Sequence, residues 1–217
     1  LTTTYKKVAI VAGIICGVAC FHYYRMSTIY AESLANAITI AEDGTVSIGE
    51  LEAFPTAYRY IDWLITVPLM VLEFPLLLAL SKKSNGLFWR LGFISLAMLV
   101  TAWIAETSDI GGVSWWGFYI VSCVFWVAIV VTLYGQVTQA AEKFSDEFKG
   151  YLNVMKKFIA IGWIIYPIGF LLALTGNESI REIAYNIADI INKVGFGVAS
   201  VMAAQVLSKM SSEERLP

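Results

Sequence analysis

The sequence carries little charge. Asp, Glu, Lys and Arg make up 15% of its 217 residues, whereas hydrophobic residues make up 58%. Soluble domains carry about 25% charged residues, so this composition does not supply the surface that a water-soluble domain needs. The mean hydropathy of +0.69 points the same way. A membrane protein is indicated, and a soluble globular protein is disfavoured.

The sequence also lacks a basic block and any cluster of metal ligands. Its 15 Lys and Arg oppose 17 Asp and Glu, so we expect no nucleic-acid partner. The three cysteines, Cys16, Cys20 and Cys123, lie in apolar runs without a CxxC pair, and there is a single histidine. Neither a disulfide framework nor a metal site is predicted, and we expect the cysteines to be buried thiols.

Long apolar runs are present instead. A helix needs about 20 apolar residues to cross the hydrocarbon of a bilayer, and six runs approach or exceed that length. They cover approximately residues 8–24, 60–80, 87–104, 115–137, 158–174 and 183–207. None shows the two-residue alternation of a barrel strand. The sequence therefore predicts an all-α membrane protein that forms one domain over residues 1–217.

The loop charges predict the orientation. Eleven of the 15 Lys and Arg fall on one side of a six-span chain, whereas Arg25 and Arg181 fall on the other. By the positive-inside rule the first side is cytoplasmic. The longest connection, residues 26–56, then faces outward. Its alternating residues 37–40 and 45–48 flank a turn-like Glu-Asp-Gly and predict a short hairpin.

Five ionisable residues fall inside apolar runs: Arg59, Asp62 and Glu73 in the second, and Asp189 and Lys193 in the sixth. Each is costly at bilayer depth, so such residues indicate function by default. Asp189 and Lys193 are four apart and share a helix face, as do Arg59 and Asp62, which are three apart. Two halves of one site are predicted to meet in the bundle. The alternative is a buried ion-pair network that only locks the two helices together.

Glu73 and Lys193 indicate a chemical function and not only a structural ion-pair network. Glu73 lies about 16 Å along the helix axis from Asp62, with no cation of its own in that helix. A carboxyl in apolar surroundings favours its neutral form, which is a potential proton donor. Lys193 is flanked by apolar residues that favour the neutral amine. Such an amine attacks aldehydes, so a Schiff base is predicted at Lys193.

Aromatic residues surround the level of that lysine in several spans. Trp63 follows Asp62, Trp163 and Tyr166 share a face next to the helix-kinking Pro167, and the fourth span carries a stripe of its own. That stripe consists of Tyr119, Ser122 and Trp126. A single stripe is more often packing than a ligand site. Several helices that aim rings at one lysine favour a long, flat, apolar ligand.

Three motifs carry a resemblance to a known family. They run from Arg59-Tyr60-Ile61-Asp62-Trp63 through Thr66 and Pro68, from Gly162-Trp163 through Tyr166-Pro167, and from Ala188-Asp189 through Asn192-Lys193 to Phe196-Gly197. In these motifs the chain resembles the microbial rhodopsins, and within them the proteorhodopsin branch, up to about Leu207. The resemblance implies a seven-helix rhodopsin bundle. This chain would begin at the second helix, so the first helix would be absent from the given residues.

The resemblance also implies roles. All-trans retinal would be bound to Lys193 as a protonated Schiff base, with Asp62 as counterion and proton acceptor and Glu73 as proton donor. Asp189 and Arg59 would complete the counterion cluster, and Thr66 completes the Asp-Thr-Glu signature of outward proton pumps. The implied retinal pocket comprises Trp63, Met70, Met98, Tyr119, Ser122, Trp126, Trp163, Tyr166 and Pro167. His22 would lie beside the counterion, and Glu106 matches an outer carboxylate.

The sequence thus predicts a light-driven outward proton pump and no enzyme. Its partners would be retinal, membrane lipid, the transported proton and further copies of the chain in a ring of five or six. The expected location is the bacterial inner membrane. Two alternatives stay open: a photosensory rhodopsin that signals through a partner protein, and a retinal-free six-helix transporter or structural bundle. Glu73 argues against the sensor, because signalling needs no proton donor there.

Overall fold

A computed structural model describes residues 3–49, 54–78 and 85–213 of the chain. Within them, six helical runs are long and apolar enough to cross a membrane. They are α1 (Thr3–Ala37), α2 (Thr56–Leu77), α3 (Asn85–Glu106), the run that begins with α4 (Val113–Thr132), the run that begins with α6 (Asp146–Ala160), and α8 (Glu178–Glu213). The predicted all-α membrane fold is confirmed.

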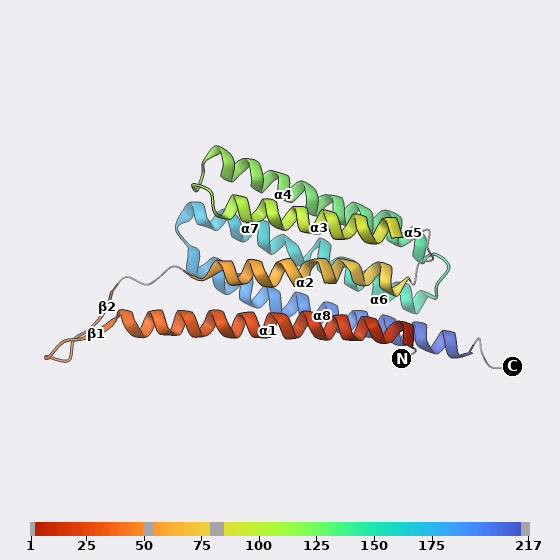
Figure 1. Ribbon diagram of the computed structural model, residues 1–217, viewed down its shortest axis with the longest axis horizontal. Helices are drawn as coiled ribbons and strands as arrows, with labels where there is room; N and C mark the ends of the chain where they lie inside the picture. The colour runs from red at the N-terminus through yellow and green to blue at the C-terminus, as the bar shows by residue number, and fades with distance from the viewer. Residues whose placement is uncertain (1–2, 50–53, 79–84, 214–217) are drawn as a thin grey trace.

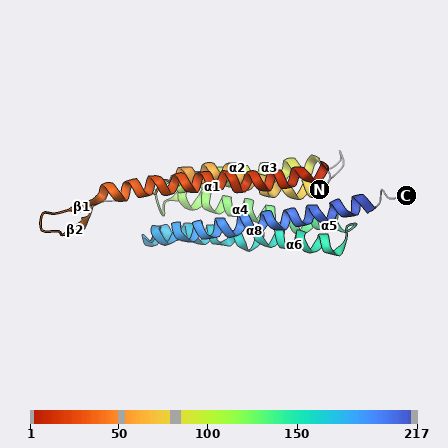
Figure 2. The ribbon, with the colours of Figure 1, turned by 90° about the horizontal axis from the view of Figure 1, so that it is seen from below.

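The helices pack around the bundle in chain order, and α8 closes it against α1 (Figure 1). Figure 2 shows α1, α2 and α3 in one layer and α6 and α8 in a second. The helix α1 begins and α8 ends at the same end of the bundle (Figure 1). The two helices that carry the ionisable residues, α2 and α8, contact each other inside the bundle.

Several helices are longer than the apolar runs that predicted them. The run at residues 8–24 is part of a helix that continues to Ala37, so the first third of the expected outer connection is helical. Likewise α8 extends past the expected 183–207 at both ends. The predicted ranges followed the hydrocarbon thickness, but an α-helix satisfies its own backbone groups and does not need to stop at the membrane surface. The last two residues of the predicted range 60–80 lie outside the described residues.

The predicted hairpin is present. Strands β1 (Ile38–Ile40) and β2 (Val46–Ile48) pair antiparallel, and Gly44 in the turn has a φ of 82°, which glycine adopts without strain. The backbone N–H of Thr45 donates to Oδ1 of Asp43 at 2.9 Å, which holds the pKa of that exposed carboxyl below its usual value. The hairpin projects beyond the end of the bundle (Figure 1).

Two membrane-length runs are irregular. The first passes from α4 through a π-helical turn, η2 (Leu133–Val137), into α5 (Thr138–Ala141). The second passes from α6 through a 3-10 turn, η3 (Gly162–Ile164), into α7 (Ile165–Leu171) and the 3-10 turn η4 (Leu172–Thr175). Pro167 has no N–H to give to the carbonyl of Trp163, so the chain deviates from α geometry at the expected position.

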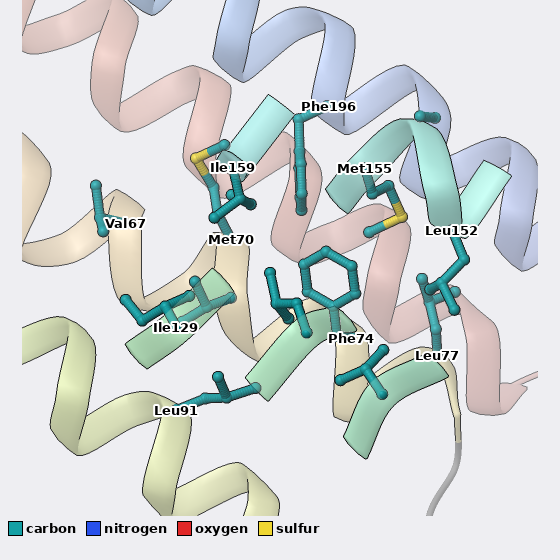
Figure 3. Close-up of a cluster of buried hydrophobic side chains, with 14 of the residues drawn as sticks. Val67, Met70, Phe74, Leu77, Leu91, Ile129, Leu152, Met155, Ile159 and Phe196 are labelled. Atoms are coloured by element: carbon teal, nitrogen blue, oxygen red, sulfur yellow. The ribbon is translucent and has the colours of Figure 1, made fainter. Parts of the chain in front are cut away.

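A cluster of apolar side chains fills the half of the bundle in which α2 ends. It joins residues of α2, α3, α4, α6 and α8, and Phe74 and Phe196 meet there edge to face with ring centroids 5.9 Å apart (Figure 3). By contrast, many large apolar side chains on the outer faces of the helices are exposed, as expected where a bundle meets lipid. Glu73, one of the ionisable residues of α2, directly precedes Phe74 of this cluster.

Candidate functional site

Lys193 lies at the centre of the site. Its side chain is 4% exposed, and its Nζ donates hydrogen bonds to Oδ2 of Asp62 and, at 2.7 Å, to Oδ2 of Asp189. Asp62 comes from α2, whereas Asp189 lies one turn before Lys193 in α8. The structure therefore brings together the two half-sites that the sequence placed on separate helices.

The two carboxylates have unequal surroundings. Asp189 also accepts hydrogen bonds from the hydroxyl of Tyr23 at 2.5 Å, from Nε1 of Trp63 at 3.0 Å and from the hydroxyl of Tyr166. Asp62 is fully buried, and its Oδ1 has no hydrogen-bond partner among the described residues. Donors that point at a carboxylate stabilise its charged form. Asp189 is therefore held as an anion, whereas Asp62 keeps an oxygen on which a proton can be placed.

Thr66 and His22 lie around Asp62. The Thr66 hydroxyl donates to the backbone carbonyl of Asp62 at 2.9 Å. This hydrogen bond stabilises the helix turn and does not involve the Asp62 carboxylate. The Nδ1 of His22 lies 2.9 Å from the carbonyl of Val18, within hydrogen-bond distance. His22 is also close enough to Asp62 to interact with it electrostatically. This is the neighbourhood in which the sequence placed it.

Arg59 has different partners from those expected. We expected it to complete the counterion cluster, but its guanidinium pairs with Glu182 and donates to Oδ1 of Asn186 at 2.6 Å. Arg181 continues the network, with Nε 3.0 Å from Glu182 and Nη1 3.1 Å from Oε1 of Glu106. The result is a chain of alternating charges that begins one turn before Asp62.

Glu73 lies apart from this network. It is fully buried, and neither carboxylate oxygen has a hydrogen-bond partner among the described residues. Its helix neighbour Phe74 belongs to the apolar cluster (Figure 3). A charged carboxylate is costly in such surroundings, so the neutral acid is the stable form.

A cavity opens next to Lys193. All ten residues that the sequence placed at the ligand line it, together with ten that it did not assign to the ligand pocket. The latter are Tyr60, Val67, Leu99, Ala102, Ala105, Cys123, Phe170, Tyr185, Asp189 and Asn192. Two of the lining residues, Tyr119 and Phe170, stack their rings with centroids 5.1 Å apart.

Three polar side chains of the cavity wall donate their hydrogen bonds to backbone carbonyls of the protein. The Ser122 hydroxyl donates to the carbonyl of Met98 at 2.9 Å, and Nε1 of Trp126 donates to the carbonyl of Ile159 at 3.0 Å. The Tyr119 hydroxyl donates across to the carbonyl of Pro167 at 3.3 Å. Ring faces and apolar groups therefore dominate the wall, with one amine at Lys193. This donor set fits a flat apolar aldehyde such as retinal.

Sequence reasoning missed several residues of the site. The Tyr23 hydroxyl donates to Asp189, and the Tyr185 hydroxyl donates to the backbone carbonyl of Tyr166. Glu182 forms an ion pair with Arg59. Glu182 had a signal, since it precedes Asp189 by seven residues and so shares its helix face. Tyr23 had none beyond its position next to His22.

Asn192, next to the central lysine, connects α8 to the 3-10 turn η3, which contains Trp163. Its Nδ2 donates to the carbonyl of Gly162 at 3.1 Å. A Cβ at Gly162 would lie 2.1 Å from Oδ1 of Asn192, so a side chain there would displace the amide. The glycine allows this close approach of the two helices.

The fold and the site define a class of membrane protein, a helical bundle with a buried lysine between two carboxylates. Comparison with known proteins identifies the family. The family described as Bacteriorhodopsin-like protein matches residues 1–207. The green-light absorbing proteorhodopsin of Gamma-proteobacterium EBAC31A08 is 32% identical over 204 residues, which cover 91% of this chain and 74% of that relative. The chain belongs to the microbial rhodopsin family.

Solved structures agree. The rhodopsin of Exiguobacterium sibiricum has a TM-score of 0.77 and 33% identity, and the match covers 97% of this chain and 87% of that one. Xanthorhodopsin, described as a light-driven ion pump with dual chromophore, has a TM-score of 0.81 and 26% identity over 98% of this chain and 85% of that one.

The family settles several of the predictions. The chain is a multi-pass membrane protein with six membrane-length helices among its described residues, its solved neighbours are seven-helix microbial rhodopsins, and retinal is the chromophore of this family. Microbial rhodopsins are light-driven pumps or photoreceptors and not enzymes, as expected. The relatives support a light-driven ion pump.

Proposed function

We propose that the chain is a light-driven pump that moves protons outward across a bacterial inner membrane, with retinal bound covalently to Nζ of Lys193. The observation that carries the proposal is the position of Lys193. Its amine touches Asp62 and Asp189 and lies at the wall of an apolar, aromatic cavity. A lysine held only for structure has no need of that cavity.

The unequal carboxylates supply a direction for the first proton transfer. Bound retinal supplies a light-driven isomerisation that alters the surroundings and the proton affinity of the Lys193 nitrogen. Asp62 accepts the proton, because it is in hydrogen-bond contact with that nitrogen and keeps an unpaired oxygen. Asp189 stays charged, because Tyr23, Trp63 and Tyr166 donate to it.

The residues on the two sides of Asp62 along α2 then give the proton separate routes for leaving and for entering. Arg59, Glu182, Arg181 and Glu106 extend from Asp62 towards the end of the bundle that carries the hairpin. Glu73 lies about three turns from Asp62 in the opposite direction, towards the end with the excess of Lys and Arg. Neutral Glu73 returns a proton to the Lys193 nitrogen and is refilled from that side. Net transport is outward.

The direct test uses cells or inward-oriented vesicles that contain the pigmented protein. Illumination should acidify the external medium of cells, and an uncoupler should abolish the change. The signal should persist when sodium is replaced by potassium and chloride by sulfate. A light response that needs sodium or chloride contradicts proton transport, and a pigment that moves no ion supports the photosensory alternative.

A further inference from the structure

Glu73 and Ser200 share an unusual feature. Both are fully buried, and both carry side-chain oxygens that have no hydrogen-bond partner among the described residues. A buried polar group without a partner is destabilising, so native structures rarely keep two of them in one neighbourhood without a reason.

The helices place these two groups next to each other. Ser200 follows Lys193 by seven residues, so it lies two turns further along the same face of α8. Glu73 lies about three turns along α2 from Asp62, in the same direction. The rings of Phe74 and Phe196, one residue before Glu73 and one turn before Ser200, meet edge to face (Figure 3). The Ser200 hydroxyl is close enough to the Glu73 carboxyl to interact with it electrostatically.

The neighbouring helix α1 offers no hydroxyl at this level of α8. A Cβ at Gly197 would meet Cβ of Ala12 at 3.7 Å and Sγ of Cys16 at 3.9 Å, so α1 presents a methyl and a thiol there. The Cys16 thiol points to the backbone carbonyl of Lys193 at 4.0 Å. Of these two helices, α8 is therefore the one that presents a hydroxyl at this level, that of Ser200.

We propose that Ser200 is a positioning residue for the proton donor: its hydroxyl hydrogen-bonds to the Glu73 carboxyl and stabilises the carboxylate that donation leaves behind. This inference rests on the proposed function. In the transfer, the O–H bond of Glu73 breaks and an N–H bond forms at Lys193. Ser200 keeps its own proton, and Glu73 regains one from the cytoplasmic side.

The kinetic test compares three variants by flash spectroscopy. Ser200→Ala should slow reprotonation of the Lys193 nitrogen about tenfold, which corresponds to about 1.4 kcal/mol. Ser200→Thr should restore the rate, because it keeps the hydroxyl. Ser95→Ala is the matched control, since Ser95 is also fully buried but donates to the carbonyl of Gly92 in its own helix at 2.9 Å. It should react at the wild-type rate, and all three variants should keep the absorption maximum.

Infrared difference spectroscopy supplies the second readout. The C=O stretch of protonated Glu73 is identified by its loss in Glu73→Gln. It should move to higher wavenumber in Ser200→Ala and return in Ser200→Thr. An unshifted band overturns the proposal, and so does a shifted band with an unchanged rate. If Glu73→Gln itself reprotonates normally, the donor role of Glu73 fails, whereas the band still reports whether Ser200 bonds to it.

Discussion

The Nζ of Lys193 lies 2.7 Å from Oδ2 of Asp189, one helical turn before it in α8, and the same oxygen accepts hydrogen bonds from Tyr23 and Trp63. Asp62 is the second carboxylate at the amine, and its Oδ1 accepts no hydrogen bond from the part of the chain that the structure describes. The lysine thus connects a carboxylate fixed in its charged form with one that is open to protonation. In the function that we propose, this asymmetry makes Asp62 the proton acceptor.

Replacing Asp62 by Asn should shift the visible absorption to the red and abolish light-driven proton release. The substitution removes the negative charge nearest the Lys193 nitrogen together with the oxygen that takes its proton. Absorption spectroscopy and external pH recordings measure the two effects. Asp62→Glu is the control, because it keeps a carboxylate and should keep some transport. An unchanged colour in Asp62→Asn removes this residue from the counterion role.

Replacing Glu73 by Gln should slow reprotonation at least tenfold and leave the colour nearly unchanged. Glu73 does not line the cavity, so the amide hardly alters the field at the chromophore, but it has no acidic proton to give. Flash spectroscopy at several pH values measures the rate. The slow rate should fall further as pH rises, because the proton then comes from solution. A fast, pH-independent rate contradicts the donor role.

Replacing Tyr166 by Phe should destabilise the pigment by about 1.5–3 kcal/mol, the usual value of a hydrogen bond to a charged group. The hydroxyl of Tyr166 donates to the buried Asp189 carboxylate. Loss of the visible band on heating measures the change. Tyr24→Phe is the matched control, because Tyr24 is 65% exposed and should tolerate the loss of its hydroxyl. Equal melting temperatures for the two variants argue against the proposed support of Asp189.

Replacing Glu182 by Gln should cost about 3 kcal/mol, because it leaves the buried Arg59 guanidinium without its carboxylate. The cost falls at the lower end of the usual range, since Asn186 still accepts from Arg59 and Glu106 still pairs with Arg181. Thermal bleaching measures it. Asp146→Asn breaks the exposed pair with Lys149 and should not change the melting temperature measurably. If both variants melt like the wild type, the outer network does not stabilise the bundle.

Much of this site was predictable from the sequence. Charge is costly in lipid, so the ionisable residues of α2 and α8 stood out, and helical spacing placed Asp62 and Lys193 on faces that meet. The aromatic residues around Lys193 were found in the same way, and the structure gathers them at one cavity. The hairpin followed from local alternation around Gly44.

The partners of Arg59 were not predictable by these means. Its pairing with Glu182 depends on how α2 and α8 are rotated against each other, and the spacing of residues within either helix does not give that rotation, although it does place Glu182 on the face of Asp189. The length of α1 was missed for another reason. Hydropathy reports only the part of a helix in lipid, whereas residues 25–37 continue the helix beyond the apolar run.

The most direct test of the account is to find the lysine that carries retinal. Borohydride reduction of the coloured protein, followed by proteolysis and mass spectrometry, should place the retinyl group on Lys193 alone. Lys193→Ala should be colourless, whereas Lys156→Ala, which alters another buried lysine, should keep its colour. A coloured wild-type protein with an unmodified Lys193, or with the group on a different lysine, would contradict the account.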